Sequence, residues 1–278
     1  MRPFSLVDVF GSGPFSGNPL GVVADAEGLS TGEMLQITRW LNLSETTFLL
    51  PPTDPAADYR VRIFTPDREM PFAGHPTLGS CRAWLESGGQ ARNPDEIVQE
   101  CGVGLVRVRR NEDLLAFAAP PLLRSGPVTD ADLADVCEVL GIGRSDIVEA
   151  QWVDNGPGWI GVRLASAEAV LALKPLGNYP RRMDIGVAGL HAEGDAAVEI
   201  RAIFSDQTGA LREDPVTGSL NASVAQWLLG SGVLKSPYVA VQGTCLDRQG
   251  RVYVSQDADG IWVGGRVAIL FSGRTANG

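Results

Sequence analysis

Carboxylates are the side chains in this sequence best suited to move protons. The chain has two histidines and two lysines against 33 aspartates and glutamates. Its four cysteines are widely spaced and form no C-x-x-C pair, so neither a zinc site nor a disulfide framework is indicated. Two histidines are too few for a His-rich metal centre or an H-E-x-x-H zinc protease. The remaining candidates for general acid and base are therefore mostly carboxylates.

Glu45 is the first of these candidates. It lies in the segment N-L-S-E-T-T-F at residues 42–48, between a predicted helix over 31–41 and a predicted strand over 46–50. A carboxylate that leads into an apolar strand can be partly buried. Burial raises its pKa toward neutrality, which suits a general base. The alternative interpretation is a solvated glutamate in a loop.

His75 and Asp214 each precede a proline that is predicted to open a long helix. Proline is favoured at the first helical position, which makes both residues predicted N-caps. Aspartate in that position stabilises a helix by about 1 kcal/mol. An open helix N-terminus binds anions, so two such ends facing each other across a domain cleft would hold a small carboxylate. Two ordinary capped helices are the alternative.

A glycine-rich loop follows the first predicted strand. Residues 10–19 read F-G-S-G-P-F-S-G-N-P, with the spacing G-x-G-x-x-x-G and no helix behind them. This spacing does not match a dinucleotide-binding fingerprint. We interpret the loop as a turn that brings Asn18 to the cleft, and a purely structural role for Asn18 is equally open. We expect His191, in a polar loop, to lie at the surface.

The elements that carry these residues repeat along the chain. I-F-T at 63–65 leads to H-P-T-L-G-S at 75–80, and I-F-S at 203–205 leads to D-P-V-T-G-S at 214–219. The Ile-Phe pairs are 140 residues apart and the Pro-x-x-Gly-Ser units are 139 apart. Each copy follows an alternating strand and ends in a nearly uncharged helix, which is typical of a helix buried on every side. We infer two similar halves, related by a pseudo-twofold, in which a sheet surrounds one central helix. A helix between two layers is the alternative.

Composition excludes several classes of function. The chain of 278 residues carries a net charge of −10, which does not favour nucleic-acid binding. No run approaches about 18 apolar residues, so no membrane helix is predicted. Asp8 falls where a signal peptide needs an apolar run, and we expect a soluble, cytoplasmic protein.

Four motifs together resemble the PhzF-like family of phenazine biosynthesis, whose fold is similar to that of diaminopimelate epimerase. They are D-V-F at 8–10 with G-N-P at 17–19, L-S-E-T at 43–46, P-F-A-G-H-P-T at 71–77, and E-D-P-V-T-G-S at 213–219. The epimerases carry one cysteine at the start of each central helix. Neither corresponding stretch here contains cysteine, so a two-thiol racemase is not expected.

The resemblance implies an α+β fold with two pseudo-symmetric domains, each a mostly antiparallel curved sheet around a central helix. We place the N-terminal half at 1–118 with 265–278 returning to it, a linker at 119–130, the C-terminal half at 131–264, and the active site in the cleft between the halves. The resemblance also implies a homodimer that needs neither a metal nor an organic cofactor.

The resemblance implies roles for individual residues as well. Glu45 is expected to move a proton, assisted by His75 and Asp214. A substrate carboxylate is expected to be held near the two helix starts. The residues expected to bind substrate are Asn18, Ser44, Gly74, Gly218 and Ser219.

The sequence thus predicts a cofactor-independent isomerase acting on a small carboxylate, cyclic or amino-acid-like, with Glu45 as general acid and base. Two alternatives stay open. One is a racemase or epimerase that uses Glu45 and Asp214 as an opposed pair. The other is a protein that binds or scaffolds small molecules on the same fold without catalysis.

Overall fold

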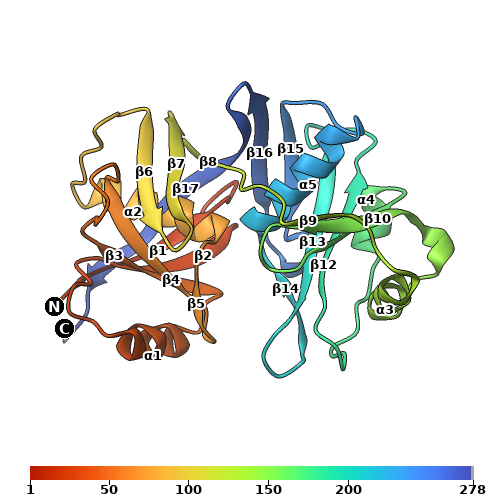
Figure 1. Ribbon diagram of the computed structural model, residues 1–278, viewed down its shortest axis with the longest axis horizontal. Helices are drawn as coiled ribbons and strands as arrows, with labels where there is room; N and C mark the ends of the chain where they lie inside the picture. The colour runs from red at the N-terminus through yellow and green to blue at the C-terminus, as the bar shows by residue number, and fades with distance from the viewer. Residues whose placement is uncertain (277–278) are drawn as a thin grey trace. The chain divides into compact units, whose positions relative to one another are not determined.

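The chain folds as two compact units in a computed structural model that describes residues 1–276. Unit 1 comprises Met1–Ala118 and the segment from Gly264 onward, and unit 2 comprises Ala119–Val263 (Figure 1). The long strand β17 (Gly260–Arg274) contributes residues to both units.

Unit 1 is built on a sheet that closes on itself. Starting at β17, the paired order is β1, β2, β3, β4, β6, β7 and β8, and β8 pairs with β17 again. The β2–β3 and β4–β6 pairs are parallel, and the pairs β1–β17, β1–β2, β3–β4, β6–β7 and β7–β8 are antiparallel. The strands are β1 (Pro3–Val9), β2 (Asn18–Val23), β3 (Glu45–Leu50), β4 (Tyr59–Phe64), the short β5 (Glu69–Met70), β6 (Glu96–Cys101), β7 (Gly104–Asn111) and β8 (Leu114–Ala118).

The helix α2 (Gly74–Glu86) lies inside this closed sheet. It contacts β1, β2, β3, β4, β6 and β8, and residues 74–81 are all buried. Its small polar side chains find partners in the interior, as when the Ser80 hydroxyl donates to Thr47 Oγ1 at 2.8 Å. The near absence of charge in this helix therefore follows from its position, because a buried charge without a partner costs several kcal/mol.

The helix α1 (Thr31–Leu41) packs on β3 and β4 through a separate core cluster. Ser30 caps it with a complete capping box, since the Glu33 amide donates to Ser30 Oγ and the Ser30 amide donates to Glu33 Oε2. Met34 and Phe48 are fully buried in this cluster. The apolar spacing and the cap explain why the sequence places this helix correctly at 31–41.

Unit 2 repeats the strand order of unit 1. Its order is β9, β10, β11, β12, β13, β15 and β16, and β14 pairs with β13. The β11–β12 and β13–β15 pairs are parallel, as are their counterparts β2–β3 and β4–β6. The strands are β9 (Arg124–Pro127), β10 (Ile147–Asp154), β11 (Ile160–Leu164), β12 (Asp184–Leu190), β13 (Val198–Ser205), β14 (Leu211–Asp214), β15 (Tyr238–Gln242) and β16 (Gly250–Asp257).

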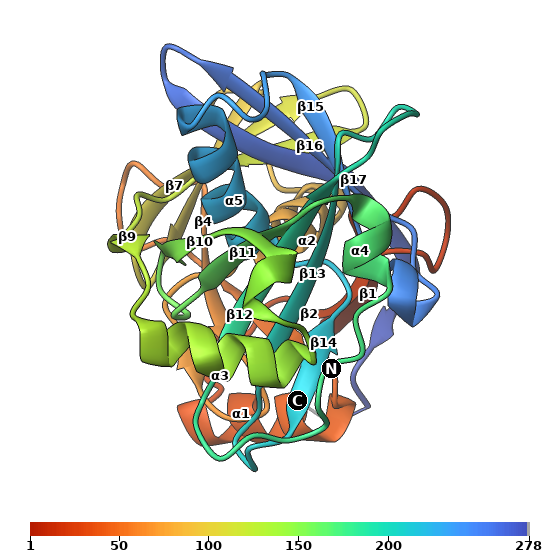
Figure 2. The ribbon, with the colours of Figure 1, turned by 90° about the vertical axis from the view of Figure 1, so that its right-hand side faces the viewer.

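The helix α5 (Gly218–Gly230) is the central helix of unit 2. It approaches β11 and β12 closely, and a Cβ on Gly186 of β12 would lie 2.1 Å from Leu220 Cδ1. The helices α3 (Asp130–Leu140) and α4 (Ala167–Leu171) pack on the same strands through a second apolar cluster, and both are seen in Figure 2. These results confirm the predicted α+β class with a curved sheet and a central helix in each unit.

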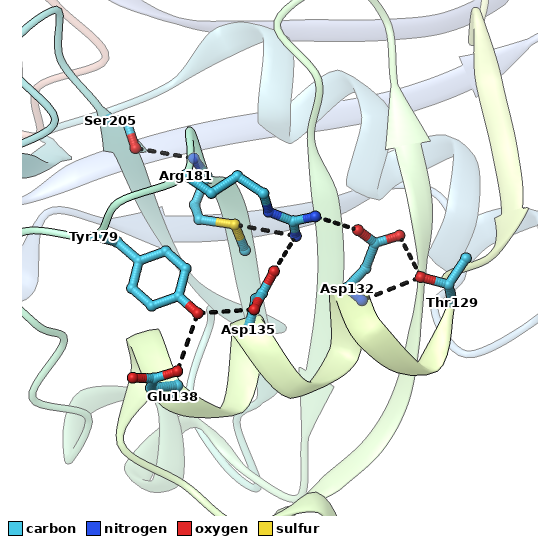
Figure 3. A network of polar contacts seen from close by, with 8 residues as sticks. Thr129, Asp132, Asp135, Glu138, Tyr179, Arg181 and Ser205 are labelled. Atoms are coloured by element: carbon cyan, nitrogen blue, oxygen red, sulfur yellow. Dashed lines mark hydrogen bonds and ion pairs between the residues drawn. The ribbon is translucent and has the colours of Figure 1, made fainter.

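The acidic side of α3 holds the segment before β12. Arg181 forms ion pairs with Asp132 and Asp135, and the Tyr179 hydroxyl donates to Asp135 and Glu138 (Figure 3). A cavity of about 490 Å³ lies beside this network, lined by residues that include Arg124, Trp152 and Arg182. The predicted site residues do not belong to its lining in the described structure.

The repeat is real at the level of topology, but its register differs from the one that the short motifs indicate. Gly74 and Gly218, the first residues of α2 and α5, are 144 residues apart, whereas the Pro-x-x-Gly-Ser units are 139 apart. His75 therefore corresponds to Ser219, as the second residue of each central helix. The matched motifs are thus offset by five residues (144 − 139) from the equivalence of the two helices.

The predicted linker at 119–130 needs correction. β9 lies within residues 119–130, which were expected to be a linker, and pairs with β10. The three prolines of this segment do not prevent a short strand, because proline is tolerated at strand ends and edges. The division into two domains around a cleft stays a prediction. No helix in the described part of the chain is long and apolar enough to span a membrane.

Candidate functional site

In unit 1, three of the predicted residues converge at the start of α2. His75 is buried, and its Nε2 lies 3.6 Å from Glu45 Oε2, slightly beyond hydrogen-bond length. On the other side of the ring, His75 Nδ1 lies 3.4 Å from Nδ2 of the fully buried Asn18. The imidazole is thus held between an amide and a carboxylate.

Burial keeps His75 uncharged. Loss of hydration lowers the pKa of its imidazole to about 3, so the ring is neutral near pH 7. The Asn18 amide donates to Nδ1, which makes Nδ1 an acceptor and assigns the ring proton to Nε2. Nε2 faces Glu45, so His75 presents a neutral N–H to the Glu45 carboxylate.

Asn18 is positioned by the loop before it. Asp8 Oδ1 accepts the Gly17 amide at 2.8 Å, and Asp8 Oδ2 accepts the Ser16 amide at 3.1 Å. Gly17 is packed so closely that a Cβ there would lie 2.2 Å from the Val9 carbonyl oxygen. Only glycine fits this approach, which explains the G-N-P sequence of the loop.

Glu45 is positioned as the first residue of β3. It stands opposite Leu20 in the parallel β2–β3 pair, and its side chain is 18% exposed. Ser44 precedes it and is half-buried. A carboxylate that is mostly buried but still reachable can accept a proton from a bound substrate.

In unit 2, Asp214 ends β14 and lies three residues before the N-cap of α5. Its carboxylate accepts a hydrogen bond from Thr217 Oγ1 at 2.5 Å. The preceding residue, Glu213, is fixed by a two-pronged ion pair with the buried Arg201, at 3.0 and 2.7 Å. This pair anchors β14 to β13 and so sets the position of Asp214.

A fully buried glutamine organises the start of α5. Gln242 Oε1 accepts from the Thr217 amide at 3.0 Å and from Asn221 Nδ2 at 2.9 Å. Its Nε2 donates to the Asp214 carbonyl oxygen at 3.0 Å. In unit 1, the fully buried Gln99 donates to Thr77 Oγ1 at 3.0 Å in the same way. Thr77 and Asn221 are both the fourth residue of their helix, so the polar network is repeated as well as the fold.

The N-terminal turns of α2 and α5 lack side-chain caps in the part of the chain that the structure describes. The N-cap residues are Ala73 and Thr217, and neither caps its helix with its side chain. The Thr217 hydroxyl is instead engaged with Asp214 and Gln242. Uncapped amides at Gly74 and His75, and at Gly218 and Ser219, are suited to bind an anionic group.

The expected N-caps are therefore wrong. His75 is the second residue of α2, and Asp214 belongs to a strand. Proline at 76 is tolerated because the first turn has no internal acceptor for its missing amide proton. Pro215 lies outside α5, since the Gln242 network holds residues 215–217 in an extended path.

His191 is also less exposed than expected. Its side chain is 24% exposed, and its Nε2 lies 3.1 Å from the buried Glu199. Burial raises the pKa of Glu199. Among residues 1–276, no group of three His, Cys, Asp or Glu side chains has an arrangement that could hold a metal ion.

Sequence reasoning missed several residues that hold the site together. Gln99 and Gln242 could have been found, because strand alternation puts them on the same buried side as Ile97 and Ala240. Asn155 and Trp159, which contact Ser219, carried no local signal. Their role depends on the pairing of distant segments.

Known proteins are similar to this chain over nearly its whole length. The sequence profile of the PhzC-PhzF family, described as phenazine biosynthesis-like protein, matches residues 7–273. Antisense-enhancing sequence 1 of Schizosaccharomyces pombe is 36% identical, over 98% of both chains. Trans-2,3-dihydro-3-hydroxyanthranilate isomerase of Pseudomonas aeruginosa is 30% identical, over 99% of both chains.

Solved structures of other proteins share the fold of this chain. A predicted epimerase from Pseudomonas aeruginosa matches with a TM-score of 0.80 and 28% identity, over 100% of both chains. A probable proline racemase from Agrobacterium radiobacter matches with a TM-score of 0.63 and 14% identity, over 100% of this chain and 94% of that chain. This second match concerns the fold alone.

Proposed function

This chain belongs to the PhzC-PhzF family of phenazine biosynthesis-like proteins, and on that premise we propose that it is a cofactor-independent isomerase that moves a proton on a small carboxylate. The observation that carries the proposal is the pairing of Glu45 with a buried, neutral His75. The carboxylate of Glu45 removes a proton at one carbon of the substrate and returns it at another.

His75 supports this role without competing for the proton. Its Nδ1 is occupied by the Asn18 amide, and its low pKa leaves the ring neutral. The Nε2–H orients the Glu45 carboxylate and stabilises its charge when the proton is on the substrate. Asn18 holds the tautomer, and Ser44 adjoins the reacting carboxylate.

Unit 2 contributes substrate binding. The amides at Gly218 and Ser219 bind the substrate carboxylate. Asp214 assists proton movement. Its fixation by Thr217 and by the Arg201–Glu213 pair supports such a role.

The assembly is proposed to be a homodimer in the cytoplasm, on the family resemblance. Sedimentation of the purified chain would then show one species with twice the 29.5 kDa mass of a single chain.

Proton movement is tested directly by NMR in D₂O. The first substrate is trans-2,3-dihydro-3-hydroxyanthranilate, on which the Pseudomonas aeruginosa relative is named to act, followed by small amino and hydroxy acids. We expect an isomerised product that carries solvent deuterium at one carbon and keeps its optical purity.

The other outcomes identify the alternatives. Deuterium at Cα with loss of optical purity would identify a racemase or epimerase that uses Glu45 and Asp214. Binding of a carboxylate without any proton exchange would identify a non-catalytic binding protein and overturn the proposal.

A further inference from the structure

Ser219 is held from two sides by residues of a single loop. Trp159 Nε1 donates to Ser219 Oγ at 3.2 Å, and Asn155 Nδ2 donates to the Ser219 carbonyl oxygen at 2.9 Å. Both residues come from the connection between β10 and β11, and Trp159 is buried. One loop therefore fixes both the side chain and the backbone of the second residue of α5.

The loop is itself clamped by an aspartate. Asp154 Oδ1 accepts the amides of Gly156 and Gly158, each at 2.7 Å. Both glycines have positive φ, 142° and 101°, a backbone conformation that other residues rarely adopt. The bend places Asn155 and Trp159 on either side of the clamp.

Unit 1 contains the same device. Asp8 accepts two amides of the loop between β1 and β2, and the residue that follows, Asn18, binds the side chain of His75. His75 and Ser219 are equivalent as second residues of the central helices. An aspartate-clamped loop that positions a reactive side chain thus occurs twice in the chain.

The chemistry of the contacts decides what Ser219 can do. An indole N–H donates only, so Ser219 Oγ accepts from Trp159 and its own hydroxyl proton must point elsewhere. Within the described residues, that proton has no protein acceptor, and Ser219 is half-exposed. A carboxylate only accepts hydrogen bonds, and it matches a hydroxyl whose proton is free to be donated.

We infer that Trp159 and Asn155 are positioning residues that make Ser219 a committed hydrogen-bond donor to the substrate carboxylate. This inference rests on the proposed function, which assigns the carboxylate to the start of α5. It also predicts a preference for an ionised carboxylate over the corresponding amide, because a hydroxyl forms a stronger hydrogen bond to a charged acceptor than to a neutral carbonyl oxygen.

The test measures binding and turnover separately. Binding of 3-hydroxyanthranilate, an aromatic analogue with no proton to shift, and of its carboxamide is measured by calorimetry for the wild-type chain and the variants. The variants are Trp159→Phe, Asn155→Ala, Ser219→Ala and the double variant Trp159→Phe/Ser219→Ala. The control is Trp262→Phe, since Trp262 Nε1 also donates over 3.2 Å, but to Asp257 of β16 and not to Ser219.

We expect Trp159→Phe to weaken carboxylate binding about five- to tenfold, the usual effect of one hydrogen bond. In turnover it should raise KM with little change in kcat. The affinity of Trp262→Phe for the carboxylate should stay within about twofold of the wild-type affinity. With Ser219 already replaced by alanine, Trp159→Phe should have no further effect, because its partner is gone. Asn155→Ala should also raise KM, and thermal unfolding checks that each variant is folded.

Three results would overturn the inference. The first is that Trp159→Phe weakens carboxylate binding equally with and without the Ser219 hydroxyl. The second is that the carboxamide binds as tightly as the carboxylate. The third is that the wild-type chain does not bind the carboxylate. Failure of the proposed function looks different. There the carboxylate binds and responds to Trp159→Phe, but no proton of any tested substrate exchanges.

Discussion

At the scale of single residues, the candidate site encloses an imidazole that burial keeps neutral. His75 is enclosed between Asn18 and Glu45, and burial lowers its pKa to about 3 from an ordinary value near 6.5. A neutral ring can donate its Nε2–H to Glu45 without a permanent positive charge. A charged ring would hold the Glu45 carboxylate in its ionised form and weaken it as a base.

This pKa has a consequence for stability. Below about pH 6.5 the unfolded chain binds a proton at His75 that the folded chain refuses until about pH 3, so stability falls as the pH drops through this window. Relative to its value at pH 8, we expect wild type to lose about 2 kcal/mol more than His75→Gln at pH 5. Urea unfolding of both chains at the two pH values measures the difference. If the unfolding free energies of the two chains fell equally between pH 8 and pH 5, His75 would take up its proton normally in the folded chain, and the expectation would be wrong.

At the scale of elements, two loops set the positions of the reactive side chains. The β1–β2 loop brings Asn18 to His75, and it does so through the Asp8 clamp and a glycine packed against backbone. Because the two closest contacts of a Cβ at Gly17 would be with backbone atoms, of Val9 and Gly11, a side chain there cannot be accommodated by a rotamer change.

We therefore expect Gly17→Ala to destabilise the fold by about 1–3 kcal/mol and to lower turnover, since Asn18 is displaced. Gly13→Ala in the same loop is the matched control, because a Cβ at that position would have no heavy atom within 4 Å and the φ of Gly13 is not positive. Its effect should stay within about 0.5 kcal/mol. Chemical denaturation and kcat measurements of both variants test this prediction. Equal unfolding free energies and equal kcat values in the two variants would contradict the role given to the loop.

The sequence was sufficient to predict elements with strong local signals. The capped helix α1, the nearly uncharged central helices and the paired halves follow from caps, charge and periodicity. The start of α5 did not follow, because the buried Gln242, from a strand later in the chain, holds residues 215–217 out of the helix. The equivalence of His75 and Ser219 did not follow either, because the match between the short motifs aligns His75 with Asp214 instead.

At the scale of the whole molecule, the duplicated fold has diverged in chemistry. The second residue of the central helix is an imidazole in unit 1 and a hydroxyl in unit 2. The proposal assigns proton transfer to Glu45 and His75 of unit 1, assisted by Asp214 of unit 2, and carboxylate binding mainly to residues of unit 2.

The proposed roles of Glu45 and Asp214 in the same proton transfer predict losses of kcat that do not multiply. Glu45→Gln and Asp214→Asn should each lower kcat, and the double variant should be less than about tenfold slower than the slower single variant, because residues that act as a unit are not additive. Steady-state kinetics of the three variants gives the answer. Independent roles would instead give a double variant whose loss is the product of the two single losses.

The central claim is that Glu45 carries the proton, and the most direct measurement is the rate of solvent deuterium incorporation in Glu45→Gln. General acid–base catalysis contributes about 10²–10⁴-fold, so exchange into the isomerised product should slow by at least that range. Glu69→Gln is the control, since Glu69 pairs with Arg62 on β4, and it should exchange at the wild-type rate. A Glu45→Gln chain that incorporates deuterium as fast as wild type would contradict the account.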